Sequence, residues 1–319
     1  MLVSIGLIIL GFVLLIKGAD FLVEGSSNIA KKFHIPEIII GLTIVSIGTS
    51  MPELFVSTTS SINGYADMSI GNIIGSNLCN LLLILGLSAL IRPIKFQRET
   101  RLIEMPMCLA VTIIFMIFCN TAGTIQKSEA IVLIMLFILF IIYTIVMAKK
   151  GEQFDKEDTI VEIKTESKKI PIAKNIIFII LGIIGLKIGG DLTVDNALII
   201  ARQFNVSEKI IGLTILAIGT SLPELVTSVT AAIKGNSDIA IGNIIGSNIF
   251  NILFIIGVSA VISPLAYNFT YNIQMIILII SMFVLSLFPV IPPKNEMSRM
   301  NGAVYLILYA IYMGILFVV

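Results

Sequence analysis

One long stretch of the chain occurs twice. Residues 41–86 and 212–257 align at a constant offset of 171 residues without a gap, and 28 of the 46 positions are identical. The segment GTSMPEL returns as GTSLPEL, and GNIIGSN returns unchanged. Each copy carries one glutamate, Glu53 or Glu224, inside an otherwise apolar stretch. This duplication predicts two equivalent halves, with the two acids related by a pseudo-two-fold axis.

The composition is that of a membrane protein. With 57% hydrophobic residues, 13% charged residues and a mean hydropathy of +1.03, the 319-residue chain is too apolar for an ordinary soluble domain. A transmembrane helix needs about 20 largely apolar residues. The first apolar run continues past Lys17 without a basic leader, so we expect a retained helix and not a cleaved signal peptide. Ten such runs are present, near 2–30, 36–61, 68–91, 102–119, 128–147, 174–203, 207–232, 239–262, 271–291 and 301–319.

Lysine and arginine are unevenly distributed among the predicted loops. If the N-terminus lies outside, the inward loops carry 16 of the 21 basic residues, and the outward loops carry only Lys127, Arg202 and Lys209. This bias predicts that both termini are extracellular and that the loop 149–174 is cytoplasmic. The small net charge of +1 gives no reason to expect a nucleic-acid partner.

The loop 149–174 also divides the chain. It mixes both charge signs and has no apolar core pattern, so we predict a solvated linker between the halves 1–148 and 175–319. Each half contains five predicted spans, and an odd number makes the second copy insert upside down. The predicted fold class is therefore an all-α protein of the cell membrane, with ten transmembrane helices arranged as two inverted-topology five-helix repeats. Secondary transporters often follow this plan, with the substrate site near mid-membrane.

A proline precedes each of the duplicated glutamates. Pro52 and Pro223 have no N–H group, so the carbonyls one turn earlier lose their usual helical partner. In hydrocarbon, such carbonyls are tolerated only where protein, water or a bound ion satisfies them. Helical spacing also aligns polar side chains along one stripe in each copy. The two stripes are Ser46, Thr49, Ser50, Glu53 and Ser57, and Ala217, Thr220, Ser221, Glu224 and Ser228.

The second motif, GNIIGSN, places amides and hydroxyls at intervals of four residues, on one face of a helix. Its glycines form small-xxx-small pairs, which let helix backbones approach closely. We therefore expect the spans that carry this motif to pack against the proline-broken spans and to direct their amides into the same cavity. The two faces consist of Asn72, Ser76 and Asn80 in the first copy, and of Asn243, Ser247 and Asn251 in the second.

Two acids inside a membrane need a compensating charge. One charged acid at mid-membrane costs about 2.5–3.5 kcal/mol, and two close together repel unless one is protonated or a cation lies between them. Neither motif contains lysine or arginine. An all-oxygen ligand set suits Ca²⁺, or Na⁺ of similar size, better than Mg²⁺, Zn²⁺ or copper. The alternative is that the prolines only kink the helices and the polar residues only hold the bundle together.

Four further acids repeat at the same offset in the long first helices of the two halves. They lie toward opposite membrane faces, which indicates either the mouths of ion cavities or interfacial anchors. These acids are Asp20, Glu24, Asp191 and Asp195.

Taken together, GTSxPEL and GNxxGSN in both halves resemble the two alpha repeats of the sodium/calcium exchangers, within the calcium/cation antiporter superfamily. The microbial members, with ten spans and a short central loop, are the most similar. The resemblance covers nearly the whole chain. It implies ion sites between spans 2, 3, 7 and 8, and sliding of spans 1 and 6 across this core to alternate access.

By position, the resemblance implies that Glu53 and Glu224 bind Ca²⁺ together with the carbonyls of Thr49 and Thr220. It implies flanking Na⁺ sites in both halves, with the asparagines completing the middle of the site. The remaining implied ligands are Ser46, Ser50, Ser76 and Asn80 in the first half, and Ala217 (through its carbonyl), Ser221, Ser247 and Asn251 in the second.

The implied function is antiport of Na⁺ against Ca²⁺ across the lipid bilayer. The ions are substrates, and we expect no resident cofactor, no enzymatic activity and a monomeric unit. Exchange of more than two Na⁺ for one Ca²⁺ would be electrogenic, and an inward Na⁺ gradient would then expel Ca²⁺. Some family members carry aspartate at the position of Asn251, which leaves the ion count and a role for K⁺ open.

Three other functions fit the sequence less well. A proton/calcium antiporter is the first, but such exchangers usually carry an acid within the second motif (GNxxE), where this chain has Gly75 and Gly246. A cation channel is disfavoured by the long sealed spans and the inverted motifs. An intramembrane enzyme is the weakest alternative, because HExxH and GxSxG motifs are absent from the sequence.

Overall fold

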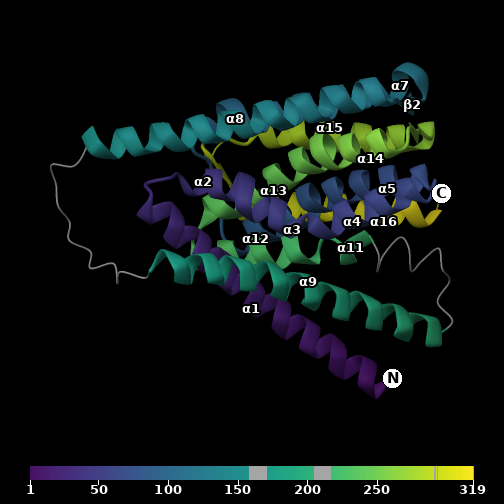
Figure 1. Cartoon of the computed structure of the whole chain (residues 1–319), viewed down its shortest axis with the longest axis horizontal. Coiled ribbons are helices and arrows are strands. Elements are labelled where there is room, and N and C mark those ends of the chain that lie inside the picture. Colours follow the sequence, from purple (N-terminus) through teal and green to yellow (C-terminus); the bar gives the residue numbers. More distant parts are fainter. Residues whose placement is uncertain (158–170, 205–216, 291, 293, 319) are drawn as a thin grey trace.

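The chain folds into long helices joined by short turns, and most of them run along the long axis of the molecule (Figure 1). The computed structural model describes residues 1–157, 171–204, 217–290, 292 and 294–318. The helical segments of the first half are α1 (Leu2–Lys32), α2 (Glu37–Ile40), η1 (Gly41–Val45), α3 (Ser46–Thr49), α4 (Met51–Ile62), α5 (Ala66–Leu78), η2 (Cys79–Ile84), α6 (Leu85–Ile91), η3 (Thr100–Glu104), α7 (Met105–Ala122) and α8 (Lys127–Glu157). Those of the second half are α9 (Ile172–Gln203), α11 (Ala217–Gly219), α12 (Leu222–Lys234), α13 (Ser237–Phe250), η5 (Asn251–Ile256), α14 (Gly257–Ile262), η6 (Phe269–Tyr271), α15 (Asn272–Leu287) and α16 (Arg299–Val318).

The helical membrane fold is confirmed. In the described part of the chain, eight helices are long and apolar enough to cross a membrane, and the pair Glu37–Thr49 and Met51–Ile62 forms a ninth span that bends by 50°. The remaining predicted span, the seventh (207–232), begins within residues 205–216, which lie outside the described residues, and α12 is its second part. Helix α8 continues to Glu157, beyond the span predicted at 128–147.

The two spans that carry GNIIGSN form the centre of the bundle. Of the most apolar part of Ala66–Ile91, 78% is buried, and the corresponding value for Ser237–Ile262 is 83%. The other membrane-length helices in the described ranges have 22–39% of that part buried, so they present most of their apolar surface outward. An apolar outer surface is what a bilayer requires, and the polar residues of the motif are thereby kept away from lipid.

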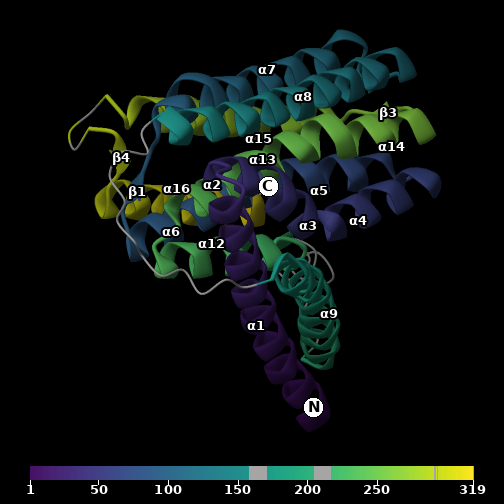
Figure 2. The same ribbon diagram turned by 60° about the vertical axis from the view of Figure 1, so that its left-hand side comes forward.

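The first helices of the two halves, α1 and α9, form a separate pair against one face of this bundle (Figure 2). Glycines bring their backbones into contact. A methyl group on Gly18 would lie 2.8 Å from the carbonyl oxygen of Gly182, and one on Gly11 would lie 2.8 Å from that of Gly189. Such close packing needs residues without side chains. The two helices therefore pack backbone to backbone at these glycines.

Two short β bridges join the halves at opposite ends of the bundle (Figure 2). Strand β1 (Ile94–Lys95) pairs with β4 (Glu296–Met297), and β2 (Thr124–Ile125) pairs with β3 (Leu265–Ala266), both antiparallel. Each bridge is extended by one more backbone hydrogen bond, from Phe96 N to Asn295 O (2.8 Å) and from Tyr267 N to Gly123 O (2.9 Å). Gly123 and Asn295 both have left-handed backbones, with φ of 62° and 63°. Glycine and asparagine are the residues that adopt this conformation most readily.

A buried acid outside the repeated motifs joins η3, the segment that leads into α7, to α8. Glu104 is fully buried, and its Oε1 accepts a hydrogen bond from the Tyr143 hydroxyl at 2.6 Å. We expect Tyr143→Phe to lower the free energy of unfolding by about 1–3 kcal/mol, because the buried carboxyl group loses its partner. Adding Glu104→Met should restore most of this loss, since no polar group is then left unpaired. Thermal unfolding of the purified protein in nanodiscs measures both, and a double variant no more stable than Tyr143→Phe would contradict this account.

Candidate cation site

The second predicted span breaks at a serine, two residues before the proline. Ser50 leaves the helix with ψ of 12°, and Ser221 does the same in the second half with ψ of 7°. Pro52 and Pro223 consequently lie in the first turn of α4 and α12, where a missing N–H group costs nothing. Each glutamate follows in the same first turn, where the positive end of the helix dipole favours a carboxylate.

Serine hydroxyls hold one oxygen of each glutamate, and for each acid one of these serines comes from the opposite half. The Glu53 Oε1 atom accepts hydrogen bonds from Ser76 Oγ (3.1 Å) and from Ser221 Oγ (3.3 Å). In the equivalent arrangement, Ser50 Oγ donates to Glu224 Oε1 at 2.7 Å and lies 2.9 Å from Ser247 Oγ. The structure thus brings the two predicted acids and four predicted serines together across the junction of the repeats.

A second set of contacts repeats the same exchange between halves. The Thr49 hydroxyl donates to Asn243 Oδ1 (3.0 Å), and the Thr220 hydroxyl donates to Asn72 Oδ1 (3.5 Å). The amide of Asn243 in turn donates to Ser228 Oγ (2.9 Å), and that of Asn72 donates to Ser57 Oγ (3.1 Å). These hydrogen bonds therefore fix each broken span to the central helix of the opposite repeat. They are made by side chains of the polar stripes and faces predicted from the sequence.

Four buried oxygens at this junction have no hydrogen-bond donor among the described residues. They are the Oε2 atoms of Glu53 and Glu224 and the Oδ1 atoms of Asn80 and Asn251. All four residues are 0% exposed. Burying a polar or charged oxygen without a partner is costly. These two carboxylate and two amide oxygens lie in equivalent positions of the two repeats. Oxygens of this kind are the ligands that a hard cation such as Ca²⁺ or Na⁺ prefers.

The other predicted ligands lie around this centre. Ser46 is fully buried in α3, where its hydroxyl donates to the carbonyl of Leu42 (2.8 Å) and its own carbonyl accepts from Ser247 Oγ (3.5 Å). Ala217 begins α11, at the edge of the described residues. Asn80 and Asn251 lie at the start of the π-helical segments η2 and η5. Such π turns often occur at functional sites, and the regular helical spacing of the motif does not reveal them.

Sequence reasoning missed one pair of residues at the site. Asn77 and Asn248 are the last residues of the repeated GNIIGSN motif, and both are 1% exposed. They lie off the stripe of residues spaced by four, so helical periodicity does not select them. Their identity in both copies of the motif was the available signal.

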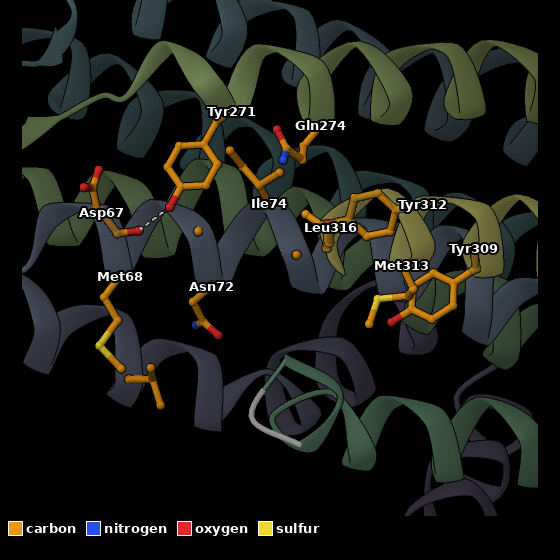
Figure 3. A pocket seen from close by; sticks show the side chains of 13 residues that line it. Asp67, Met68, Asn72, Ile74, Tyr271, Gln274, Tyr309, Tyr312, Met313 and Leu316 are labelled. Atoms are coloured by element: carbon orange, nitrogen blue, oxygen red, sulfur yellow. Dashed lines mark hydrogen bonds between the residues drawn. The ribbon is translucent and has the colours of Figure 1, made fainter. Parts of the chain in front are cut away.

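Two cavities approach the site at the Thr220–Asn72 contact. One, of about 400 Å³, lies between α4, α9 and α12 and is lined by Pro52, Thr220, Asp191 and Asp195, among others. The other, of about 320 Å³, reaches Asn72 between α5, α15 and α16 (Figure 3). Two of the four repeated acids, Asp191 and Asp195, thus line a cavity. The tyrosines of the second cavity, Tyr271, Tyr309 and Tyr312, were not predicted.

The two halves differ in accessibility although their motifs match. Thr49 is fully buried, whereas its counterpart Thr220 is only half-buried. Asp20 of α1 forms an ion pair with Lys234 of α12 (3.0 Å). Asn63 stands at the position equivalent to Lys234. The site is thus fully buried at Thr49 and is approached by the two cavities at Thr220 and Asn72.

Comparison with known proteins agrees with this geometry. The family model described as sodium/calcium exchanger protein matches residues 3–146 and 174–318, which together contain both repeats. The chain belongs to the sodium/calcium exchanger family. This is a family of transporters and not a class of enzymes. The match covers every residue of the site described above.

Individual relatives are similar over most of their length. The chain is 38% identical to the inner membrane protein YrbG of Escherichia coli strain K12 over 88% of each chain. It is 32% identical to the sodium/calcium exchanger MaX1 of Methanosarcina acetivorans, covering 98% of this chain and 97% of MaX1. A solved structure of the sodium-calcium exchanger NCX_Mj superimposes with a TM-score of 0.84 at 34% identity, over 99% of both chains. Membership of this family supports cation exchange as the activity of this chain.

Proposed function

We propose that the protein is a secondary antiporter that exchanges Na⁺ for Ca²⁺ by alternating access. One observation carries this proposal. Two fully buried glutamates, one from each repeat, each have one oxygen held by serines and one oxygen without a donor among the described residues. A Ca²⁺ ion takes about 6–8 oxygen ligands in flexible geometry and neutralises both charges at once. Several Na⁺ ions can do the same with overlapping ligands.

In this proposal, Glu53 and Glu224 hold Ca²⁺ together with the backbone carbonyls of Thr49 and Thr220. The Na⁺ ions occupy flanking positions that share these oxygens, so the two kinds of ion exclude each other. The serines that fix the carboxylates also serve as Na⁺ ligands. The complete set of flanking and central ligands is Ser46, Ser50, Ser76 and Asn80 with Ala217, Ser221, Ser247 and Asn251.

The buried charges couple the two transport directions. Closing the cavity over two bare carboxylates is costly, because each charged acid at mid-membrane costs about 2.5–3.5 kcal/mol. The protein should therefore change between its two states of alternating access only when bound cations neutralise the site. If more than two Na⁺ ions replace one Ca²⁺, the exchange moves net charge, and an inward Na⁺ gradient drives Ca²⁺ out of the cell.

The arrangement of the ends of the chain supports the proposed orientation. Both termini lie at one end of the molecule, and the C-terminal end of α8 and the start of α9 lie at the opposite end (Figure 1). Together with the excess of basic residues in the alternate loops, this favours extracellular termini and a cytoplasmic 149–174 segment. Since each chain contributes both glutamates, we propose that a monomer transports and that no resident cofactor is needed.

Purified full-length protein in liposomes tests the proposal. Vesicles loaded with Na⁺ and diluted into Na⁺-free buffer with radioactive Ca²⁺ should accumulate Ca²⁺ against its gradient. Accumulation should require internal Na⁺ and persist with a protonophore. If more than two Na⁺ leave for each Ca²⁺, the lumen becomes negative, so valinomycin with equal K⁺ on both sides should accelerate uptake.

The alternatives give different results in the same vesicles. Uphill Ca²⁺ uptake driven by a pH gradient without Na⁺ would identify a proton antiporter. Ca²⁺ movement that only follows its own gradient would identify a channel. Either outcome would overturn the proposed exchange.

A further inference from the structure

The four asparagines at the centre of the site form a crossed hydrogen-bond relay. The side-chain amide of Asn77 donates to the backbone carbonyl of Asn248 (3.3 Å), and that of Asn248 donates to the backbone carbonyl of Asn77 (3.4 Å). The Asn251 amide donates to Asn77 Oδ1 (2.9 Å), and the Asn80 amide donates to Asn248 Oδ1 (3.1 Å). Each ligand asparagine is thus paired with a residue of the other repeat.

The hydrogen-bond partners in the relay determine the orientation of each side-chain amide, that is, the positions of its NH₂ group and its Oδ1 atom. A backbone carbonyl only accepts, so the edge of Asn77 that faces Asn248 O must be its NH₂ group. The Oδ1 atom of Asn77 therefore lies on the other edge, and it too only accepts. The edge of Asn251 that meets it must then be NH₂, which turns Asn251 Oδ1 away from the relay. The same steps, started from Asn248, orient Asn80.

The oxygens oriented in this way are the two amide oxygens that lack a donor among the described residues. The Asn251 NH₂ group also lies 3.4 Å from Ser76 Oγ, a serine that binds the Glu53 carboxylate, so this amide belongs to the network around the acids. An asparagine side chain offers a cation either an oxygen or a repelling NH₂ group, depending on a half-turn about one bond. Burial of all four residues leaves no water to satisfy the wrong orientation.

We propose that Asn77 and Asn248 are positioning residues that hold the amides of Asn251 and Asn80 with their oxygens toward the transported cation. This inference rests on the proposed function, since it assigns a role within the same site. Asn77 acts on Asn251, 174 residues away, and not on Asn80, which lies three residues away on the same span. Asn248 acts on Asn80 in the same way.

Double-mutant cycles test this crossed pairing. Full-length protein in nanodiscs is titrated with Ca²⁺ by calorimetry for Asn77→Ala, Asn251→Ala and the double variant. Asn77→Ala should weaken Ca²⁺ binding by at least 10-fold in the wild-type background, and by less than 2-fold when Asn251→Ala is already present. In the matched cycle of Asn77→Ala with Asn80→Ala, the two effects should multiply, because Asn248 still orients Asn80.

A purely structural role gives a different pattern. In that case Asn77→Ala lowers the melting temperature of the ion-free protein but leaves Ca²⁺ affinity unchanged, or weakens binding by the same factor in both backgrounds, and either result would overturn the proposal. If Asn77→Ala does not yield folded protein, the cycle of Asn248→Ala with Asn80→Ala makes the equivalent test. Glu53→Gln separates the two proposals. Ca²⁺ binding that survives this change refutes the exchange function itself, whereas lost binding with multiplicative cycles refutes only the relay.

Discussion

Glu53→Gln and Glu224→Gln are each expected to reduce Na⁺-dependent Ca²⁺ uptake by at least about 100-fold. Removing one partner of a buried charge pair costs about 3–5 kcal/mol, and each 1.4 kcal/mol corresponds to about a factor of ten. Glutamine has nearly the same shape and can still accept the serine hydrogen bonds, so the fold should persist. Radioactive Ca²⁺ uptake into liposomes and calorimetric Ca²⁺ titration of the same preparations measure the effect.

The chain offers a matched control for these variants. Glu104 is also fully buried within a membrane-length helix, but it lies outside the repeated motifs and binds Tyr143. Glu104→Gln should therefore retain Ca²⁺ binding. If it lost binding as completely as Glu53→Gln, the effect would be a general consequence of changing buried acids, and the assignment of the two repeated glutamates would fail.

Gly246→Ala is expected to reduce transport strongly by disturbing the fold. An added methyl group would lie 2.6 Å from both the carbonyl oxygen of Leu42 and the hydroxyl of Ser46. Backbone atoms cannot rotate away, so α13 would be forced from the broken span that carries Thr49 and Ser50. Overpacking of this kind costs about 1–3 kcal/mol or more. We expect uptake below about a tenth of wild type and a lower melting temperature, measured on the purified protein.

Gly6→Ala is the control for this overpacking. Gly6 lies in α1, and an added methyl group there meets no described atom within 4 Å. Alanine has a higher helix propensity than glycine, by up to about 1 kcal/mol. Transport and stability should therefore be kept or slightly raised. Equal damage from Gly6→Ala and Gly246→Ala would show that the close approach of α13 is not what matters.

The sequence was most informative where chemistry and periodicity agreed. The duplication, the prolines and the spacing of hydroxyls predicted that Glu53, Glu224 and the serines would meet, because each repeat had to supply the same ligands. The apolar runs predicted most of the described spans to within a few residues, since a membrane helix is defined by its length and hydropathy, but α8 continues past its predicted end. Binding of ions by these residues stays a prediction.

Features that depend on contacts between distant segments were not predictable. The π turns at Asn80 and Asn251 change the direction of side chains that regular helical spacing places differently. The relay through Asn77 and Asn248 depends on how two central helices cross. Likewise, nothing local to Asp20 indicates an ion pair with Lys234, which is 214 residues away.

The β bridges have a consequence for how the loops of this chain can change. They join β1 to β4 and β2 to β3 through main-chain hydrogen bonds, which every residue except proline can make. Substitutions in these strands can therefore alter the exposed side chains at either surface while the connection between the halves persists. The loops are free to diverge in charge and size without separating the two glutamates that they indirectly hold together.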